Sequence, residues 1–207
     1  MFGPLKSLLF LAVLWLPLSF FVWFYFAQVF VIPIASLAFA VLHNLMPGTF
    51  EAIEQSGRLL TLVTTLPVMI DGRAGVALVE VNPMIYGYCI PVLAGLVMAT
   101  PLRGWQRAWQ LALGTLVLML VQTFGTVFDV LKNVALRSGE VGASAVAEAG
   151  ISVDAIAFCY QFGYLVLPAI MPVILWVAFN QAFIRSLVTI EGSELPEIGT
   201  SGRDTKS

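Results

Sequence analysis

The chain has 207 residues, of which 59% are hydrophobic and only 11% are charged, and its formal net charge is −2. Soluble domains carry about 25% charged residues, so a chain this poor in charge cannot cover a surface that faces water. The composition therefore excludes a soluble enzyme, a disordered protein and a nucleic-acid binder, and it predicts a multi-pass protein surrounded by membrane lipids.

The first apolar run covers residues 8–42 and contains no charged residue. A bilayer core is crossed by about 20 helical residues, so this run is too long for one span and slightly short for two spans with a turn. We predict a first transmembrane helix over residues 8–29, a break at Pro33, and an interfacial helix over residues 34–46.

The next segment, residues 48–84, contains acidic and basic residues and is predicted to leave the lipid. Two runs rich in β-branched residues, 58–66 and 75–81, flank the pair Asp71-Gly72. An Asp-Gly pair between two such runs is a strong hairpin signal. We therefore predict a small extracytoplasmic β-hairpin over residues 58–82, which must rest on helix ends or on a partner because two strands alone are marginal.

Three further apolar segments are predicted to cross the membrane, at residues 84–100, 108–130 and 154–183. Residues 133–153 are rich in small residues and are predicted to be a linker, and residues 191–207 are predicted to be a disordered cytoplasmic tail. The predicted fold is an all-α membrane protein, in which residues 1–190 form a single integral-membrane domain. Its parts are a four-transmembrane-helix bundle, the interfacial helix and the small β-hairpin.

The orientation is predicted from a short loop that carries Arg103 and Arg107 and no acidic residue. Basic residues are enriched in short cytoplasmic loops. Both termini are therefore predicted to be cytoplasmic, with the hairpin and residues 131–153 on the opposite side.

The candidates for chemistry are the two cysteines, Cys89 and Cys159, and the lone histidine, His43. All three are predicted near the outer membrane surface, where His43 could act as a base for a nucleophilic Cys89. A disulfide between the cysteines in an oxidising compartment is a second interpretation, and simple packing of both thiols is a third. The residues form no metal motif, and the sequence indicates no cofactor.

No predicted span carries a charged residue near the middle of the bilayer, which argues against ion-coupled transport. Asp129 and Lys132 are predicted to form an i, i+3 pair at the end of the third span. The remaining intramembrane polar groups are Gln122 and Thr123 in the third span and Tyr160, Gln161, Asn180 and Gln181 in the fourth. Gln122 facing Gln161 would join two helices by a hydrogen bond, whereas a polar cavity lined by Gln122, Gln161 and Asn180 would indicate a small transporter or a lipid-binding protein.

Two stretches, residues 81–100 and 160–176, resemble segments of small membrane proteins that accompany exosortases. The chain as a whole is similar to the family of exosortase H-associated membrane proteins. This resemblance implies a protein of the bacterial inner membrane that takes part in protein sorting, with an exosortase-like enzyme as its membrane partner.

Exosortases themselves resemble membrane cysteine transpeptidases that use Cys, Arg and His in that chain order. Cys89 could take the position of the cysteine, but His43 precedes it, and residues 122–128 contain no arginine. The favoured function is therefore a non-catalytic accessory protein that binds the sortase or its substrate. The alternative is a membrane cysteine transpeptidase or peptidase that uses Cys89.

Overall fold

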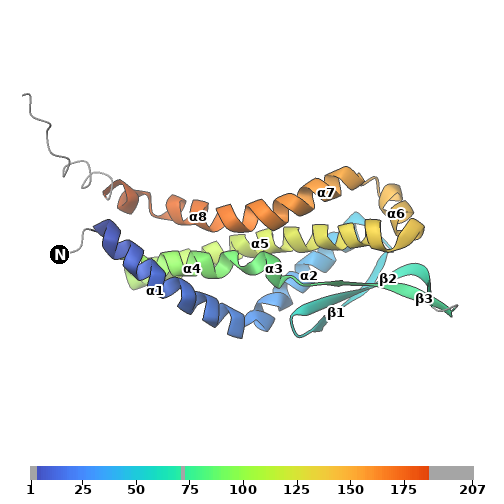
Figure 1. Cartoon of the computed structure of the whole chain (residues 1–207), viewed down its shortest axis with the longest axis horizontal. Helices are drawn as coiled ribbons and strands as arrows, with labels where there is room; N and C mark the ends of the chain where they lie inside the picture. The colour runs from blue at the N-terminus through green and yellow to red at the C-terminus, as the bar shows by residue number, and fades with distance from the viewer. Residues whose placement is uncertain (1–3, 71–72, 187–207) are drawn as a thin grey trace, which may run out of the picture.

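The computed structural model describes residues 4–70 and 73–186, which form a mostly helical molecule with one small antiparallel sheet (Figure 1). Four helices in the described part are long and apolar enough to cross a membrane; in chain order they are Lys6–Tyr25, Ala27–Leu45, Gly104–Arg137 and Val153–Phe179. A shorter apolar helical segment lies at Met84–Ala99. The first and the last described residues lie at the same end of the long axis, and the sheet lies toward the other end (Figure 1).

The first two helices are α1 (Pro4–Tyr25) and α2 (Ala27–Leu45), with only Phe26 between them. The predicted break at Pro33 is wrong, because Pro33 lies inside α2. The expected interfacial helix over residues 34–46 is therefore the second part of a longer helix. A membrane helix tolerates a proline because neighbouring groups and small local adjustments satisfy the backbone carbonyl that the proline leaves free.

The actual break between α1 and α2 is held by a side chain from the sheet. Arg58 donates a hydrogen bond to the carbonyl oxygen of Phe24 at 3.2 Å, and its guanidinium carbon lies 3.8 Å from the centroid of the Phe24 ring. The amide of Gln55 donates to the carbonyl oxygen of Gln28 at 3.1 Å. The last carbonyl groups of a helix, such as that of Phe24 in α1, need donors from outside the helix. Arg58 supplies one, and Gln55 adds a second link to the first turn of α2, at a bend that no local sequence signal marks.

The sheet has three strands, β1 (Phe50–Ser56), β2 (Leu59–Ile70) and β3 (Arg73–Val81), in the order β1-β2-β3. The predicted hairpin is present as β2 and β3, and β1 is an additional strand. The expected Asp71-Gly72 turn lies outside the described residues, although Ile70 and Arg73 on either side of it are paired. A tight turn at Gly57, whose φ is +63°, joins β1 to β2.

The remaining helical elements are α3 (Met84–Gly87), α4 (Cys89–Ala99), α5 (Gly104–Arg137), α6 (Gly139–Glu148), α7 (Val153–Gln161), the π-helix η1 (Phe162–Val166) and α8 (Leu167–Phe179). The second predicted span is thus interrupted at Tyr88. The third, predicted over residues 108–130, is far longer, since α5 has 34 residues and a length of about 51 Å. The predicted linker over residues 133–153 is largely helical, because it contains the end of α5 and the whole of α6.

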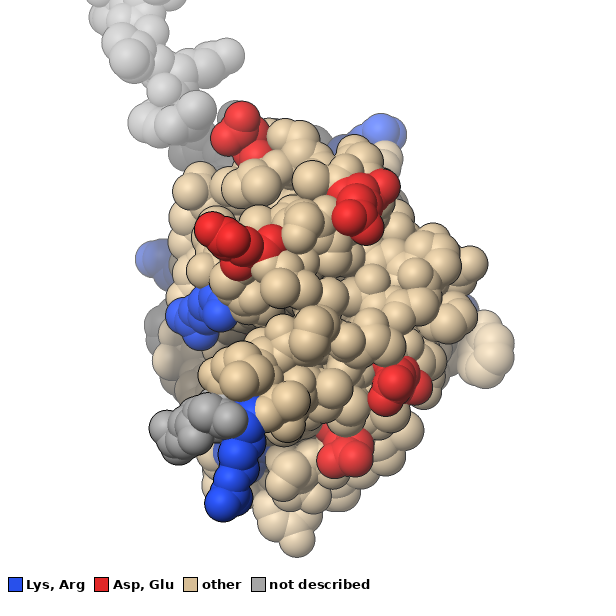
Figure 2. All heavy atoms as spheres, turned by 90° about the vertical axis from the view of Figure 1, so that its right-hand side faces the viewer, with Lys and Arg blue, Asp and Glu red and all other residues tan. Residues whose placement is uncertain are grey.

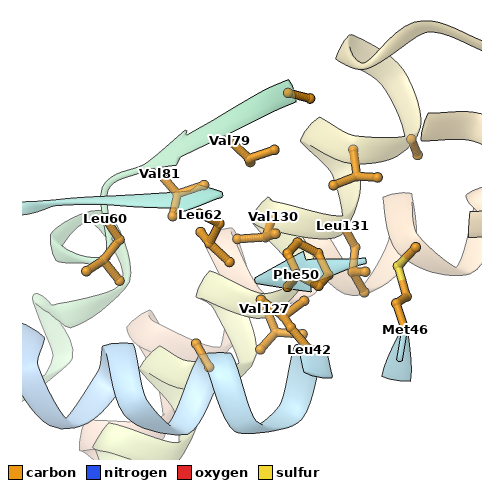
Figure 3. Packing of buried hydrophobic residues seen from close by; sticks show 14 of the residues in the cluster. Leu42, Met46, Phe50, Leu60, Leu62, Val79, Val81, Val127, Val130 and Leu131 are labelled. Atoms are coloured by element: carbon orange, nitrogen blue, oxygen red, sulfur yellow. The ribbon is translucent and has the colours of Figure 1, made fainter. Parts of the chain in front are cut away.

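Two hydrophobic clusters follow each other along the long axis. One lies among α1, α4, α5 and α8 and includes Trp23, Leu93 and Leu118. The other joins α2, the sheet, the second half of α5 and α6. Figure 3 shows its centre, where Leu62 and Val79 of the sheet face Val130 of α5.

The outer surface of the molecule is apolar along α1 and carries charged side chains at the end that holds the sheet. The exposed face of α1 is apolar, with Phe10 73% and Phe21 71% exposed. Figure 2 shows acidic and basic side chains spread over the end of the molecule that holds the sheet. Exposed apolar side chains on a helix long enough to cross a bilayer are typical of contact with lipid.

Candidate functional site

A buried carboxylate with a lysine partner lies on the stretch of α5 that also carries Val127 and Val130 of the second cluster. Asp129 of α5 is only 6% exposed, and its Oδ1 lies 2.7 Å from the Nζ of Lys132. The predicted i, i+3 pair is thus confirmed. Asn133 donates from Nδ2 both to Oδ1 and to the backbone oxygen of Asp129, at 3.1 and 2.8 Å. The carboxylate is therefore compensated by two side chains of its own helix, as a buried charge requires.

Three tyrosines from other elements complete this cluster. The Nζ of Lys132 lies 3.7 Å from the ring centroid of Tyr160, a cation–π contact. Tyr160 stacks on Tyr164 with centroids 6.0 Å apart, and Tyr164 meets Tyr86 edge to face at 6.1 Å. We call Tyr86, Asp129, Lys132, Tyr160 and Tyr164 the tyrosine–aspartate–lysine cluster. It joins α3, α5, α7 and η1.

Tyr86 is the innermost member of the cluster. Its side chain is completely buried, and its hydroxyl group lies close to the carboxylate of Asp129. A buried hydroxyl without a partner is costly, so Asp129 is the acceptor that the cluster offers to Tyr86.

Glycines allow the helices of the site to approach closely. A Cβ atom at Gly125 would lie 2.7 Å from Cγ of Tyr86, and a Cβ atom at Gly163 would lie 3.1 Å from Cδ1 of Phe124. Gly163 also belongs to η1, a π-helix that follows α7 and places Tyr164 in the cluster. Single π-helical turns are rare and occur frequently at functional sites.

The predicted intramembrane amides lie in different places. Gln122 is buried and donates from Nε2 to the carbonyl oxygen of Pro83 at 3.0 Å, which fixes the start of α3 beside α5. Gln161 is exposed, and no hydrogen bond joins it to Gln122 in the described part of the chain. Asn180 instead pairs with Gln110 through two reciprocal amide hydrogen bonds of 3.0 and 3.1 Å. Hydrogen bonds of this kind between side-chain amides of different helices hold membrane helices together.

The three candidates for chemistry are also separate. Cys89 is 0% exposed, lies within the cluster of apolar side chains around α4, and donates from Sγ to the carbonyl oxygen of Tyr86 at 3.4 Å. His43 lies on the exposed side of the last turn of α2, where it stacks on Phe39. Cys159 is half-buried on α7, and both thiols are free.

The arrangement can anchor helices, and the thiol of Cys89 lies buried beside it. In residues 4–70 and 73–186, no group of three or more His, Cys, Asp or Glu side chains is placed to hold a metal ion. The charged pair was foreseeable from its spacing. Tyr160 was among the predicted intramembrane polar groups. Tyr86 and Tyr164 were not, although both stand out as polar-tipped residues in otherwise apolar segments.

Comparison with known proteins identifies the family. No curated protein and no solved structure matches the chain. A family model described as exosortase H-associated membrane protein matches residues 3–183, which is most of the chain and includes both hydrophobic clusters and the tyrosine–aspartate–lysine cluster. The chain therefore belongs to the family of exosortase H-associated membrane proteins.

Proposed function

We propose that this protein is a non-catalytic accessory component of an exosortase-type protein-sorting system in the bacterial inner membrane, where it binds the sortase or the sortase's substrate. Membership of a family defined by association with exosortase H carries this proposal. The apolar outer face of α1 supports it, because a helix that is unburied in the monomer can contact either lipid or another membrane protein.

The orientation that we infer places both termini in the cytoplasm and the sheet outside, with residues 1–190 as one integral-membrane unit. Arg103 lies directly before α5, and Arg107 lies in its first turn. This end of α5 is at the end of the molecule where α1 also starts, so the basic short loop and the first described residues share one side (Figure 1). Such a loop favours the cytoplasmic side. Labelling of intact spheroplasts tests this orientation. Single cysteines are introduced at Ser7 and at Ser56 of a cysteine-free variant and are exposed to a cysteine-reactive probe from outside. Labelling at Ser7 from outside would contradict it.

The surroundings of Cys89 favour the accessory role over the alternative of a cysteine transpeptidase or peptidase. A catalytic thiol must reach its substrate, and the thiol of Cys89 is covered on all sides and bonded to the Tyr86 carbonyl oxygen. His43 projects from a different helix, on its exposed side. Cys89→Ala and His43→Ala variants should therefore leave substrate processing unchanged in cells. Loss of processing in both variants would establish the alternative.

Co-purification tests the proposal directly. The tagged protein and the exosortase from the same organism are co-expressed, solubilised in a mild detergent and captured through the tag. We expect the sortase to be retained by this protein and not by an unrelated four-span membrane protein with the same tag. Absence of retention together with normal sorting in a deletion strain would refute the proposed function.

A further inference from the structure

A groove lies beside the free edge of the sheet, away from the tyrosine–aspartate–lysine cluster. It has a volume of about 510 Å³ and is lined on one side by β3, from Val76 to Glu80, and on the other by Asn133 and Arg137 of the last turns of α5. The groove thus combines a strand edge with a helix end that carries a cation.

The backbone groups that face the groove can be identified from the strand pairing. β3 pairs with β2 along one edge only in the described sheet. The hydroxyl of Thr64 on β2 donates to the carbonyl oxygen of Ala77 at 2.8 Å, so the backbone of Ala77 faces β2. Because successive residues of a strand direct their backbone groups to alternate edges, Val76, Leu78 and Glu80 direct theirs to the free edge.

Nothing in the described part of the chain occupies this edge. The backbone bonds outside the regular elements include none from Val76, Leu78 or Glu80. The three residues extend over about 14 Å, which is the length of a strand of about five residues. A free edge of this kind is a template for an added strand, whose main chain would supply the missing hydrogen bonds.

The opposite wall indicates the chemistry of the occupant. Arg137 is exposed and forms no ion pair with any described residue. Asn133 is 7% exposed; its Nδ2 donates to Asp129, and its Oδ1 has no hydrogen-bond partner among the described residues. An arginine next to a strand edge suits a carboxylate, which it binds with two parallel hydrogen bonds. Glu80 lies across the groove and would repel a second acidic group there.

A second copy of this chain fits the edge poorly. In each copy the end of α5 flanks the free edge of β3, so a second β3 strand would have to enter the groove together with the α5 that packs against it. A single extended segment carries no such helix and places its side chains against the apolar side chains of Val76 and Leu78, which are 45% and 62% exposed.

We propose that the groove between β3 and the end of α5 binds an extended peptide segment that pairs with β3 and places one carboxylate on Arg137. This inference goes beyond the association with exosortase and holds or fails independently of it.

The test uses the full chain in lipid nanodiscs and a dye-labelled, end-blocked peptide, Thr-Val-Thr-Val-Glu-Val, with binding followed by fluorescence anisotropy. A second peptide has Gln in place of Glu, a third is N-methylated at alternate amides, and empty nanodiscs are the blank. We expect saturable binding of the Glu peptide and weak binding of the N-methylated peptide, which cannot pair along a strand edge.

Variants separate the two contacts. Arg137→Gln should weaken binding of the Glu peptide about tenfold and should leave the Gln peptide unaffected. Arg73→Gln removes the same charge from β3 outside the groove and should change neither. Leu78→Pro removes one outward N–H without breaking the β2–β3 ladder and should weaken both peptides, whereas Leu78→Thr should not.

Three results would overturn the proposal. The first is no binding of the Glu peptide above the empty-nanodisc blank. The second is equal binding of the Glu, Gln and N-methylated peptides by the unaltered chain and by Arg137→Gln. The third is a dimer in nanodiscs or detergent that Leu78→Pro dissociates, which would assign the edge to a second copy. None of these results bears on the co-purification with a sortase.

Discussion

Replacement of Gly125 by alanine is expected to loosen the tyrosine–aspartate–lysine cluster. The new Cβ atom would lie 2.7 Å from Cγ of Tyr86, about 1 Å closer than the optimal separation of two carbon atoms. Tyr86 is completely buried, so its ring cannot move away without disturbing its neighbours. Overpacking costs about 1–3 kcal/mol, and the upper part of this range, about 2–3 kcal/mol, applies because Cδ1 of Tyr86 would be closer still to the new Cβ atom. The better helix propensity of alanine returns about 1 kcal/mol. The free energy of unfolding should therefore fall by about 1–2 kcal/mol.

Thermal unfolding in detergent measures this effect. For a chain of about 200 residues, a loss of 1–2 kcal/mol corresponds to a fall in Tm of about 2–8 °C. Gly104→Ala is the matched control, because nothing lies within 4 Å of a Cβ atom at that position. It should not lower the Tm.

A double variant tests whether the overlap with Tyr86 is the cause. In a Tyr86→Ala background the ring and its Cγ atom are absent, so Gly125→Ala should cost less than half of what it costs in the unaltered chain. An unchanged Tm in Gly125→Ala, or an equal loss in both backgrounds, would refute the reasoning.

Three further perturbations probe other contacts. Lys132→Met leaves the buried Asp129 without its cation and should lower the free energy of unfolding by about 3 kcal/mol. Combining it with Asp129→Leu should recover part of this loss, and equal stability of the single and double variants would contradict the role of the pair. Gln110→Leu and Asn180→Leu should each lower the free energy of unfolding by about 1 kcal/mol. A double-mutant cycle of unfolding in detergent should give a coupling energy near 0.6 kcal/mol, and strict additivity of the two losses would disprove a direct hydrogen bond. Arg58→Ala removes the donor to the α1–α2 bend and should speed proteolysis near residue 26. Arg58→Lys should restore only part of the protection, because lysine lacks the planar guanidinium group. Identical digestion of the unaltered chain and both variants would exclude this contact as the support of the bend.

The sequence was most informative where one local signal decides the structure. The apolar runs predicted membrane-crossing helices, and the strand pattern around Asp71-Gly72 predicted the pairing of β2 with β3. The i, i+3 spacing of Asp129 and Lys132 predicted their ion pair. In each case the relevant residues are close together in the chain, so periodicity and spacing contain the information.

The sequence was misleading where contacts between distant segments decide. The bend at Phe26 is contacted by Arg58, more than 30 residues later, whereas Pro33 gave a strong but incorrect local signal. β1 carries Glu51 and Glu54 and lacks the clear apolar alternation of a strand, but pairing with β2 satisfies its backbone. The tyrosines of the candidate site come together through the approach of α3 and η1 to Gly125, which is a property of the packed structure and not of any single segment.

The single long helix α5 contributes side chains to both hydrophobic clusters and so connects them rigidly. At about 51 Å it exceeds the hydrocarbon thickness of a bilayer by about 20 Å. A rigid rod of this length converts a small tilt at one end into a large displacement at the other, so a tilt of about 10° moves its far end by about 9 Å. Arg137 belongs to the final turn of α5, so a tilt of this helix within the membrane would move one wall of the groove beside β3.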